Sequence, residues 1–152
     1  MIKANVVVDK ASWKKKVKNP KKYFSKKLNE ISKITSTLKE KNIIFTILLT
    51  NSSEMKKLNK KFRDKNIPTD VLSFPHFPFK EFKLKRENKL YIGDIAVSYE
   101  IINSRSKRSN FFLEFDKAWI HGFLHLLGYD HIKNRDYLKM KKVEKNIINL
   151  IT

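Results

Sequence analysis

The chain has 152 residues, no cysteine and 41% hydrophobic residues, which excludes a disulfide scaffold, a cysteine-based zinc finger and a disordered chain. Its 34 lysine and arginine residues outnumber 15 acidic residues and give a formal charge of +19, so nucleic acid is the first candidate partner and an anionic membrane the second. The N-terminus lacks a signal-peptide pattern and no apolar run approaches the roughly 20 residues that span a bilayer, so we expect a soluble, cytoplasmic protein with no membrane as its partner.

The first half of the chain predicts two strands and two helices. Ile2–Val8 is β-branched and alternates weakly, which is typical of a strand. A helix is expected from Pro20 to Leu38, because apolar residues recur there at spacings of three and four. Asn42–Thr50 is almost continuously apolar and predicts a strand buried on both faces. The second helix should run to about Phe62, with Ser52 or Ser53 as its cap and three residues on its inner side: Met55, Leu58 and Phe62.

The second half predicts two more strands and three helices. Thr69–Phe74 and Leu90–Ser98 are the expected strands, and the charged, proline-containing stretch between them, Pro75–Lys89, predicts a long mobile loop. A short helix is expected from Tyr99 to about Arg105, followed by a long helix that Asn110 caps and Gly128 ends. The last helix is amphipathic, with the apolar residues Tyr137, Leu138, Val143, Ile147 and Ile148. This order predicts one α+β domain over residues 1–152, with a small mixed sheet packed with helices.

Lysines concentrate near the N-terminus, where twelve lysines and two acidic residues lie between Lys10 and Lys41. The candidate RNA-binding residues in this segment are Lys14, Lys15, Lys16 and Lys18, because clustered lysines bind a phosphate backbone. The alternative is compositional drift, since lysines outnumber arginines 29 to 5 and Lys, Asn and Ile are all abundant, as AT-rich coding sequence produces. Charge alone leaves both explanations open.

Three of the four histidines lie within eleven residues, in the segment His121-Gly-Phe-Leu-His125-Leu-Leu-Gly128-Tyr-Asp130-His131. Residues four apart share one face of a helix, so His121 and His125 can present two imidazoles to one ion. Gly128 can end the helix in the left-handed conformation, and the chain can then return His131 as a third nitrogen ligand. Three protein ligands with one open position are typical of catalytic zinc. We therefore predict one zinc ion per chain, in a zincin-like site at the end of the long helix.

The histidine spacing matches the metzincin peptidase pattern H-E-x-x-H-x-x-G-x-x-H except at one position. Gly122 stands where those peptidases have the general-base Glu, and a glycine cannot take a proton from water or pass it to a leaving amine. A metalloprotease-like hydrolase is therefore the runner-up interpretation. The fourth histidine, His76, lies in the proline-rich loop and is expected to be a surface residue.

The histidine segment, together with two others, resembles the YbeY family of bacterial endoribonucleases and ribosomal RNA maturation factors. The second segment is Leu58–Pro75, which contains Leu58-Asn59, Phe62-Arg63 and Pro68-Thr69-Asp70-Val71-Leu72-Ser73-Phe74-Pro75, and the third is Gly93-Asp94-Ile95-Ala96-Val97-Ser98. Their order and spacing fit that family over roughly residues 42–150. Phe62 replaces the family's usual Tyr and Asn66 its usual Asp, which removes a hydroxyl and a negative charge beside Arg63.

The resemblance implies a zinc-dependent, single-strand-preferring endoribonuclease that acts in ribosomal RNA maturation and ribosome quality control. Its implied partners are RNA and the ribosome or small-subunit assembly components. Water and the substrate's own 2′-OH both stay open as the nucleophile. Arg63 becomes the candidate catalytic residue, because a guanidinium stabilises charge that develops on phosphate oxygens. Asp130, beside His131, can orient a ligand histidine or simply form the turn. A non-catalytic, zinc-containing RNA-binding assembly factor stays open as an alternative.

Overall fold

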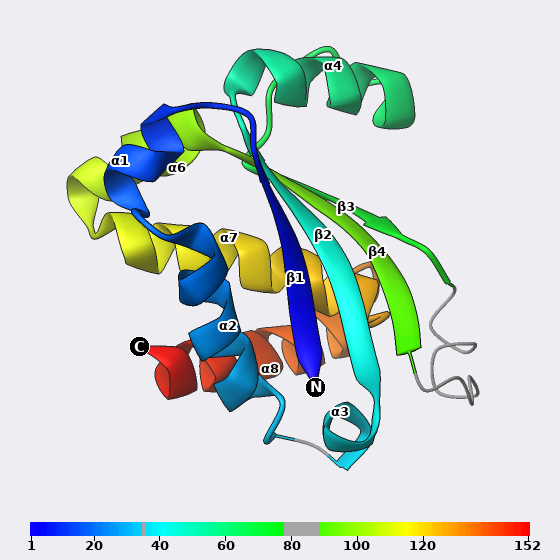
Figure 1. Ribbon diagram of the computed structural model, residues 1–152. Coiled ribbons are helices and arrows are strands. Elements are labelled where there is room, and N and C mark those ends of the chain that lie inside the picture. The colour runs from blue at the N-terminus through cyan, green and yellow to red at the C-terminus, as the bar shows by residue number, and fades with distance from the viewer. Residues whose placement is uncertain (35, 78–88) are drawn as a thin grey trace.

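A four-stranded mixed sheet forms the centre of the molecule in this computed structural model, which describes residues 1–34, 36–77 and 89–152 (Figure 1). The strands β1 (Ile2–Val8), β2 (Asn42–Thr50), β3 (Val71–Pro75) and β4 (Lys89–Ser98) lie in the order β1-β2-β4-β3. The first, second and fourth strands are parallel, whereas β3 runs antiparallel to β4 at the sheet edge. The predicted α+β class with a small mixed sheet is confirmed.

The two faces of the sheet are covered unequally. The helices α2 (Pro20–Ile31), α7 (Phe111–Leu126) and α8 (Asn134–Ile151) form a layer on one face, and α4 (Ser52–Arg63) packs on the other face at one end of the strands (Figure 1). Shorter helices connect these elements: α1 (Ser12–Lys16), α3 (Ser36–Glu40), α6 (Tyr99–Arg105) and the 3₁₀ helix η1 (Ser106–Arg108). Among the described residues, no helix is both long and apolar enough to cross a membrane.

The main core lies between the sheet and the three-helix layer. It is rich in fully buried aromatic side chains, namely Trp13, Phe24, Phe45, Phe115, Trp119 and Phe123. On β2, Phe45 and Ile47 face this core and are fully buried, whereas Ile44 and Leu48 face the other way and are only partly buried. The expectation of a strand buried on both faces therefore holds in part, because α4 covers only one end of the outer face.

The helices in the first half of the chain differ from the prediction. The helix predicted from Pro20 to Leu38 ends at Ile31, and Leu38 lies in α3. A helix of that predicted length would extend about 28 Å, whereas the strand β1 that α2 packs against is only about 23 Å long, so the chain has to turn back to start β2. The segment before Pro20 contains the unpredicted helix α1, whose Trp13 is buried and donates through Nε1 to the Thr50 carbonyl (2.9 Å).

The cap of α4 is Asn51 and not Ser52 or Ser53, because the Asn51 side chain accepts a hydrogen bond from the Glu54 amide (2.9 Å). Phe62 was expected inside, but its side chain is 56% exposed because the end of α4 extends beyond the sheet. In α8, Leu138 is likewise exposed, and Met140 takes the core position instead. The predicted mobile loop falls mainly on residues 78–88, outside the described residues.

Candidate metal centre and its cavity

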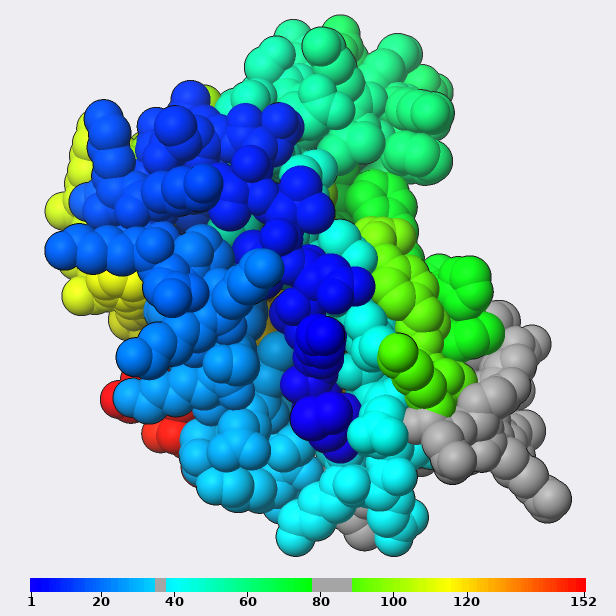
Figure 2. Space-filling model, viewed as in Figure 1, coloured from blue at the N-terminus to red at the C-terminus, as the bar shows by residue number. Residues whose placement is uncertain are grey.

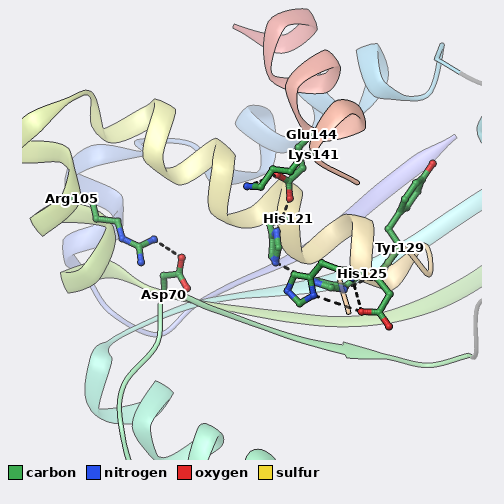
Figure 3. A network of polar contacts seen from close by, with 9 residues as sticks. Asp70, Arg105, His121, His125, Tyr129, Lys141 and Glu144 are labelled. Atoms are coloured by element: carbon green, nitrogen blue, oxygen red, sulfur yellow. Dashed lines mark hydrogen bonds and ion pairs between the residues drawn. The ribbon is translucent and has the colours of Figure 1, made fainter. Parts of the chain in front are cut away.

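Three histidines converge at the C-terminal end of α7. Figure 3 shows two of them, His121 and His125. His121 and His125 lie one helical turn apart, and their Nε2 atoms are 3.1 Å from each other. The His131 ring lies beside both, with ring centroids 5.5 Å from His121 and 4.9 Å from His125. One ligand nitrogen from each histidine falls within 4.8 Å of the other two, so the predicted clustering is confirmed and the group can hold a metal ion.

The turn after α7 is what brings His131 into the group. Asn110 begins the helix as predicted, since its side chain accepts from the Phe112 and Leu113 amides. At the other end Gly128 has φ +92°, and the amides of Gly128 and Tyr129 donate back to the carbonyls of His125 and Leu124. This pair of bonds is the Schellman arrangement, which reverses the chain direction at a glycine. The predicted helix end at Gly128 is confirmed.

The outer nitrogens of two histidines are fixed by hydrogen bonds. His125 Nδ1 lies 2.9 Å from the Tyr129 backbone oxygen, which can only accept, so this nitrogen carries the proton. His121 Nδ1 lies 2.5 Å from Glu144 Oε1 on α8, and it donates in the same way (Figure 3). Histidines that bind metals typically donate their second ring N–H to a carboxylate or a carbonyl, which fixes the ring and its tautomer.

These bonds make the inner nitrogens fit a cation. With the protons on Nδ1, the two Nε2 atoms face each other at 3.1 Å with their lone pairs, which repel unless a positive charge lies between them. Two ligands of a tetrahedral zinc lie about 3.3 Å apart when each Zn–N distance is about 2.05 Å. The observed separation is close to that value, so the donor set and its spacing fit a metal held by three imidazoles.

The protonation state also favours metal binding. Burial lowers the pKa of His125 below its ordinary value, and the neighbouring His121 and His131 lower it further, against the opposing effects of the Tyr129 carbonyl and Asp130. Burial alone would raise the pKa of Glu144, but the bonds and charges of His121 and Lys141 outweigh it and hold this pKa below its ordinary value. A neutral imidazole and an ionised carboxylate are the forms that a metal site requires.

Glu144 is the site residue that the sequence did not indicate. It lies in the middle of α8, twenty-three residues after His121, within a lysine-rich amphipathic helix that shows no motif. Asp130, the predicted orienting carboxylate, instead accepts from the His131 amide (2.7 Å), and its closest approach to His131 Nδ1 is 3.6 Å. The observed contact is the turn-forming one, and an orienting role for Asp130 stays a prediction.

A cavity of about 1130 Å³ opens in front of the histidines, between β3, α7 and α8. Arg63, the last residue of α4, lines this cavity together with His121, His125 and His131. Its position depends on Asn59, which is 2% exposed and donates through its side chain to the Ile67 carbonyl (2.9 Å), so that the chain after Arg63 is anchored. The fold therefore brings the candidate catalytic residue and the candidate ligands to one cavity.

The cavity rim is positively charged. Basic side chains from four elements line it: Arg63, Arg105, Lys117, Lys141 and Lys145. Three of them face carboxylates, as Arg105 pairs with Asp70 (2.5 Å), Lys117 with Glu114 (3.4 Å) and Lys141 with Glu144 (3.4 Å). In the part of the chain that the structure describes, no carboxylate lies within ion-pair distance of Arg63 or Lys145. These two cations are available to a bound anion.

The family model for endoribonuclease YbeY matches residues 7–152 of the chain. This chain belongs to the YbeY endoribonuclease family. A relative named endoribonuclease YbeY from Pelagibacter ubique is 48% identical over 99% of this chain and 97% of its own length, and one from Buchnera aphidicola (subsp. Acyrthosiphon pisum) is 42% identical over 95% and 90%. A solution structure of a Thermotoga maritima protein is similar with a TM-score of 0.63 and 26% identity, covering 99% of this chain and 89% of that one.

Gly122 separates this YbeY chain from the metzincin pattern for a structural reason. A Cβ atom at this position would lie 3.0–3.1 Å from the side chains of Ile95, Ser73 and Val71, so α7 touches the sheet here. A glutamate would have to displace those residues, and the position offers no place for a general base. The geometry therefore gives the peptidase alternative no support.

Of the two departures from the YbeY family pattern, Phe62 lies at the cavity edge. Phe62 lines the cavity and packs edge-on against Phe74, with the ring centroids 5.1 Å apart, so the ring is retained where the hydroxyl is missing. Asn66 is exposed. The strand residues quoted for the resemblance make structural bonds as well: Asp70 accepts from the Val71 amide (2.8 Å), and Asp94 accepts from the Tyr91 hydroxyl (2.5 Å).

The predicted lysine cluster lies away from the metal centre. The exposed residues Lys14, Lys15 and Lys16 belong to α1, and Lys18 follows it. Lys16 lies over the ring of Phe111, the first residue of α7, which is ten residues or about 15 Å along the helix from His121. Figure 2 shows α1 and α2 on one flank of the molecule, whereas β3, which lines the cavity, lies on the opposite flank. RNA binding by these lysines stays a prediction.

Proposed function

We propose that this chain is a zinc-dependent endoribonuclease that cleaves single-stranded RNA at the cavity in front of His121, His125 and His131. The observation that carries the proposal is the convergence of three imidazoles, with inner nitrogens 3.1 Å apart in the closest pair, in a cavity that Arg63 also lines. The family supports the RNA substrate, because the relatives are named endoribonucleases.

Zinc is the proposed metal because of the donor set. The ligands are imidazole nitrogens without a carboxylate, which suits zinc and other transition metals and does not suit magnesium or calcium. When bound, zinc supplies Lewis acidity that polarises a phosphate oxygen and lowers the pKa of water toward about 7. Glu144 and the Tyr129 carbonyl hold the His121 and His125 rings so that Nε2 faces the metal position.

Arg63 has the role of stabilising negative charge on the phosphate. Attack on phosphorus increases the charge on the non-bridging oxygens, and a guanidinium binds two of them with parallel N–H donors. Because Arg63 has no carboxylate partner among the described residues, it does not have to leave an ion pair when the phosphate enters. Lys145 on α8, which also has no carboxylate partner among the described residues, adds a second cation to the cavity lining.

The shape of the cavity supports a single-stranded substrate. The phosphate has to approach the metal-facing nitrogens of histidines that are only partly exposed; the side chain of His121, for example, is 29% exposed. A flexible single strand can bend a phosphodiester into such a recess, whereas a stiff duplex presents its phosphates on a convex surface. We place the enzyme in ribosomal RNA maturation and ribosome quality control in the cytoplasm, with the ribosome or small-subunit assembly components as partners, on the basis of the family resemblance.

The test compares cleavage of one labelled RNA sequence as a single strand and as a duplex. Zinc-replete wild-type protein should cleave the single strand faster, and His125→Ala should remove the activity while the protein stays folded. A control variant, Lys142→Gln on the exposed side of α8, should behave as wild type. Tight RNA binding without cleavage by zinc-replete wild type would favour the assembly-factor alternative, and cleavage by His125→Ala equal to wild type would remove the histidine site from the reaction.

A further inference from the structure

A second basic depression adjoins the metal cavity. Its volume is about 610 Å³, and it is lined by the end of α6 and by η1, with the cations Arg105, Lys107 and Arg108 and the hydroxyl residues Ser104 and Ser109. Arg105 and Glu114 line both this depression and the metal cavity, so the two are adjacent (Figure 3 shows Arg105 beside α7). Neither the histidine motif nor Arg63 accounts for this cluster.

The charges in the depression favour an anion. Its carboxylate, Glu114, already accepts from the Ser109 hydroxyl (2.8 Å) and pairs with Lys117 (3.4 Å). Lys107 and Arg108 are exposed, and in the described part of the chain no carboxylate pairs with either. A phosphodiester that extends from the metal cavity would therefore meet two uncompensated cations beside Ser104.

The use of arginine in these cavities differs from the rest of the chain. The described residues that line the two cavities include seven basic side chains, of which three are arginine. The sequence has 34 basic residues, and only two of the remaining 27 are arginine. A drift toward lysine does not explain arginines that gather in one place. Arginine binds phosphate with a planar, two-pronged donor set that lysine lacks, so a phosphate site is the chemical reason to place it here.

We propose that the depression formed by Arg105, Lys107 and Arg108 is a docking subsite for the RNA backbone on one side of the scissile phosphate. This inference rests on the proposed ribonuclease function and adds a direction to it: the strand leaves the metal cavity toward the start of α7. Glu114, which both cavities share, precedes His121 by seven residues, or about 10 Å along the helix. The subsite therefore holds a phosphate within a few nucleotides of the cleaved bond.

The subsite binds RNA and does not take part in the chemistry. Lys107 and Arg108 contact the backbone away from the reacting phosphate, so their loss should weaken binding and leave the rate at saturating RNA unchanged. Each lost contact with a single strand should reduce the steepness of the slope of log affinity against log salt by about 0.7. For the double variant Lys107→Gln/Arg108→Gln, the slope should therefore be less steep by about 1.4. Its affinity for RNA should fall roughly 2- to 30-fold, the range for two exposed charge contacts.

The experiment uses zinc-replete protein and 2′-O-methyl oligouridylates of two to ten nucleotides, whose 2′-oxygens cannot attack. The length of each strand is checked after the measurement, so that hydrolysis by water is detected. The affinity of wild type should increase once the strand is long enough to reach from the histidines to the subsite, and the double variant should not show this increase. The matched control is Lys21→Gln/Lys26→Gln, which removes two exposed charges from α2, outside both cavities. This control should show the same increase of affinity with strand length as wild type. Arg108→Lys, which retains the charge, should keep the salt slope.

Two results would overturn the inference. In the first, the double variant shows the same salt slope as wild type and the same increase of affinity with strand length. In the second, the α2 control loses as much affinity as the double variant. Cleavage of unmodified RNA by the same preparations is measured in parallel. Wild-type cleavage with an unaffected double variant would reject the subsite and leave the proposed function standing. Absence of zinc-dependent cleavage in wild type would reject the function, whereas the binding comparison would still decide whether the depression holds RNA.

Discussion

Removing the Glu144 side chain should weaken zinc binding without removing a zinc ligand. Its Oε1 accepts from His121 Nδ1 at 2.5 Å, and the two side chains are only 14% and 29% exposed. Loss of a carboxylate that orients a ligand histidine typically costs about 10–100-fold in metal affinity, which corresponds to about 1.4–2.7 kcal/mol. Charge-assisted bonds are roughly twice as strong as neutral ones, so Glu144→Gln, which keeps an acceptor oxygen, should cost only about 3–10-fold.

The assay is competition for zinc between the protein and a chelator of known affinity at pH 7, with the unfolding temperature of the metal-free proteins measured beside it. Glu114→Gln is the matched control, because Glu114 lines the same cavity but bonds to Ser109 and Lys117 instead of a histidine. The expected order of zinc affinity is wild type and Glu114→Gln, then Glu144→Gln, then Glu144→Ala. Equal affinities for Glu144→Ala and wild type would refute the orienting role of the carboxylate.

Three further predictions concern charge and stability. Arg63→Ala should lower the single-turnover cleavage rate at saturating RNA by roughly 10²–10³ with little loss of RNA affinity, since one charge-stabilising donor is worth about 2.7–4 kcal/mol in the transition state; equal losses in rate and affinity would make it a docking residue. Replacing Lys14, Lys15, Lys16 and Lys18 with Gln should make the slope of log affinity against log salt less steep. An unchanged slope would mean that these lysines reflect the composition of the chain and do not bind RNA. Tyr23→Phe removes a 2.6 Å hydrogen bond to the buried Asp116 and should cost about 1.5–3 kcal/mol in chemical denaturation with zinc content unchanged; a stability equal to wild type would contradict this.

The parts of the fold that local patterns determine could be predicted from the sequence. Asn110 and Gly128 specify the two ends of α7 through short-range bonds, and the spacing of His121 and His125 places them on one helix face. The strands follow from apolar runs of the right length. Each of these features depends on neighbours within a few residues, which is why the sequence alone was sufficient.

The features that were missed depend on contacts between distant segments. Glu144 acts on His121 only because α8 packs beside α7, and no local pattern reports that packing. Phe62 has the spacing of an inner residue, but α4 extends past the sheet and leaves its ring exposed. The helix predicted to reach Leu38 stops at Ile31 because the neighbouring strand is shorter than such a helix. Tertiary packing decides all three cases.

The most direct test of the account is a zinc titration of metal-free protein with RNA cleavage as the readout. Protein stripped with a chelator should be inactive, and activity should rise linearly with added zinc and level off at one ion per chain, while His125→Ala should show no such endpoint. Two results would contradict a ribonuclease centre held by His121, His125 and His131. One is activity that chelation does not reduce, and the other is activity that levels off at a zinc concentration unrelated to the protein concentration.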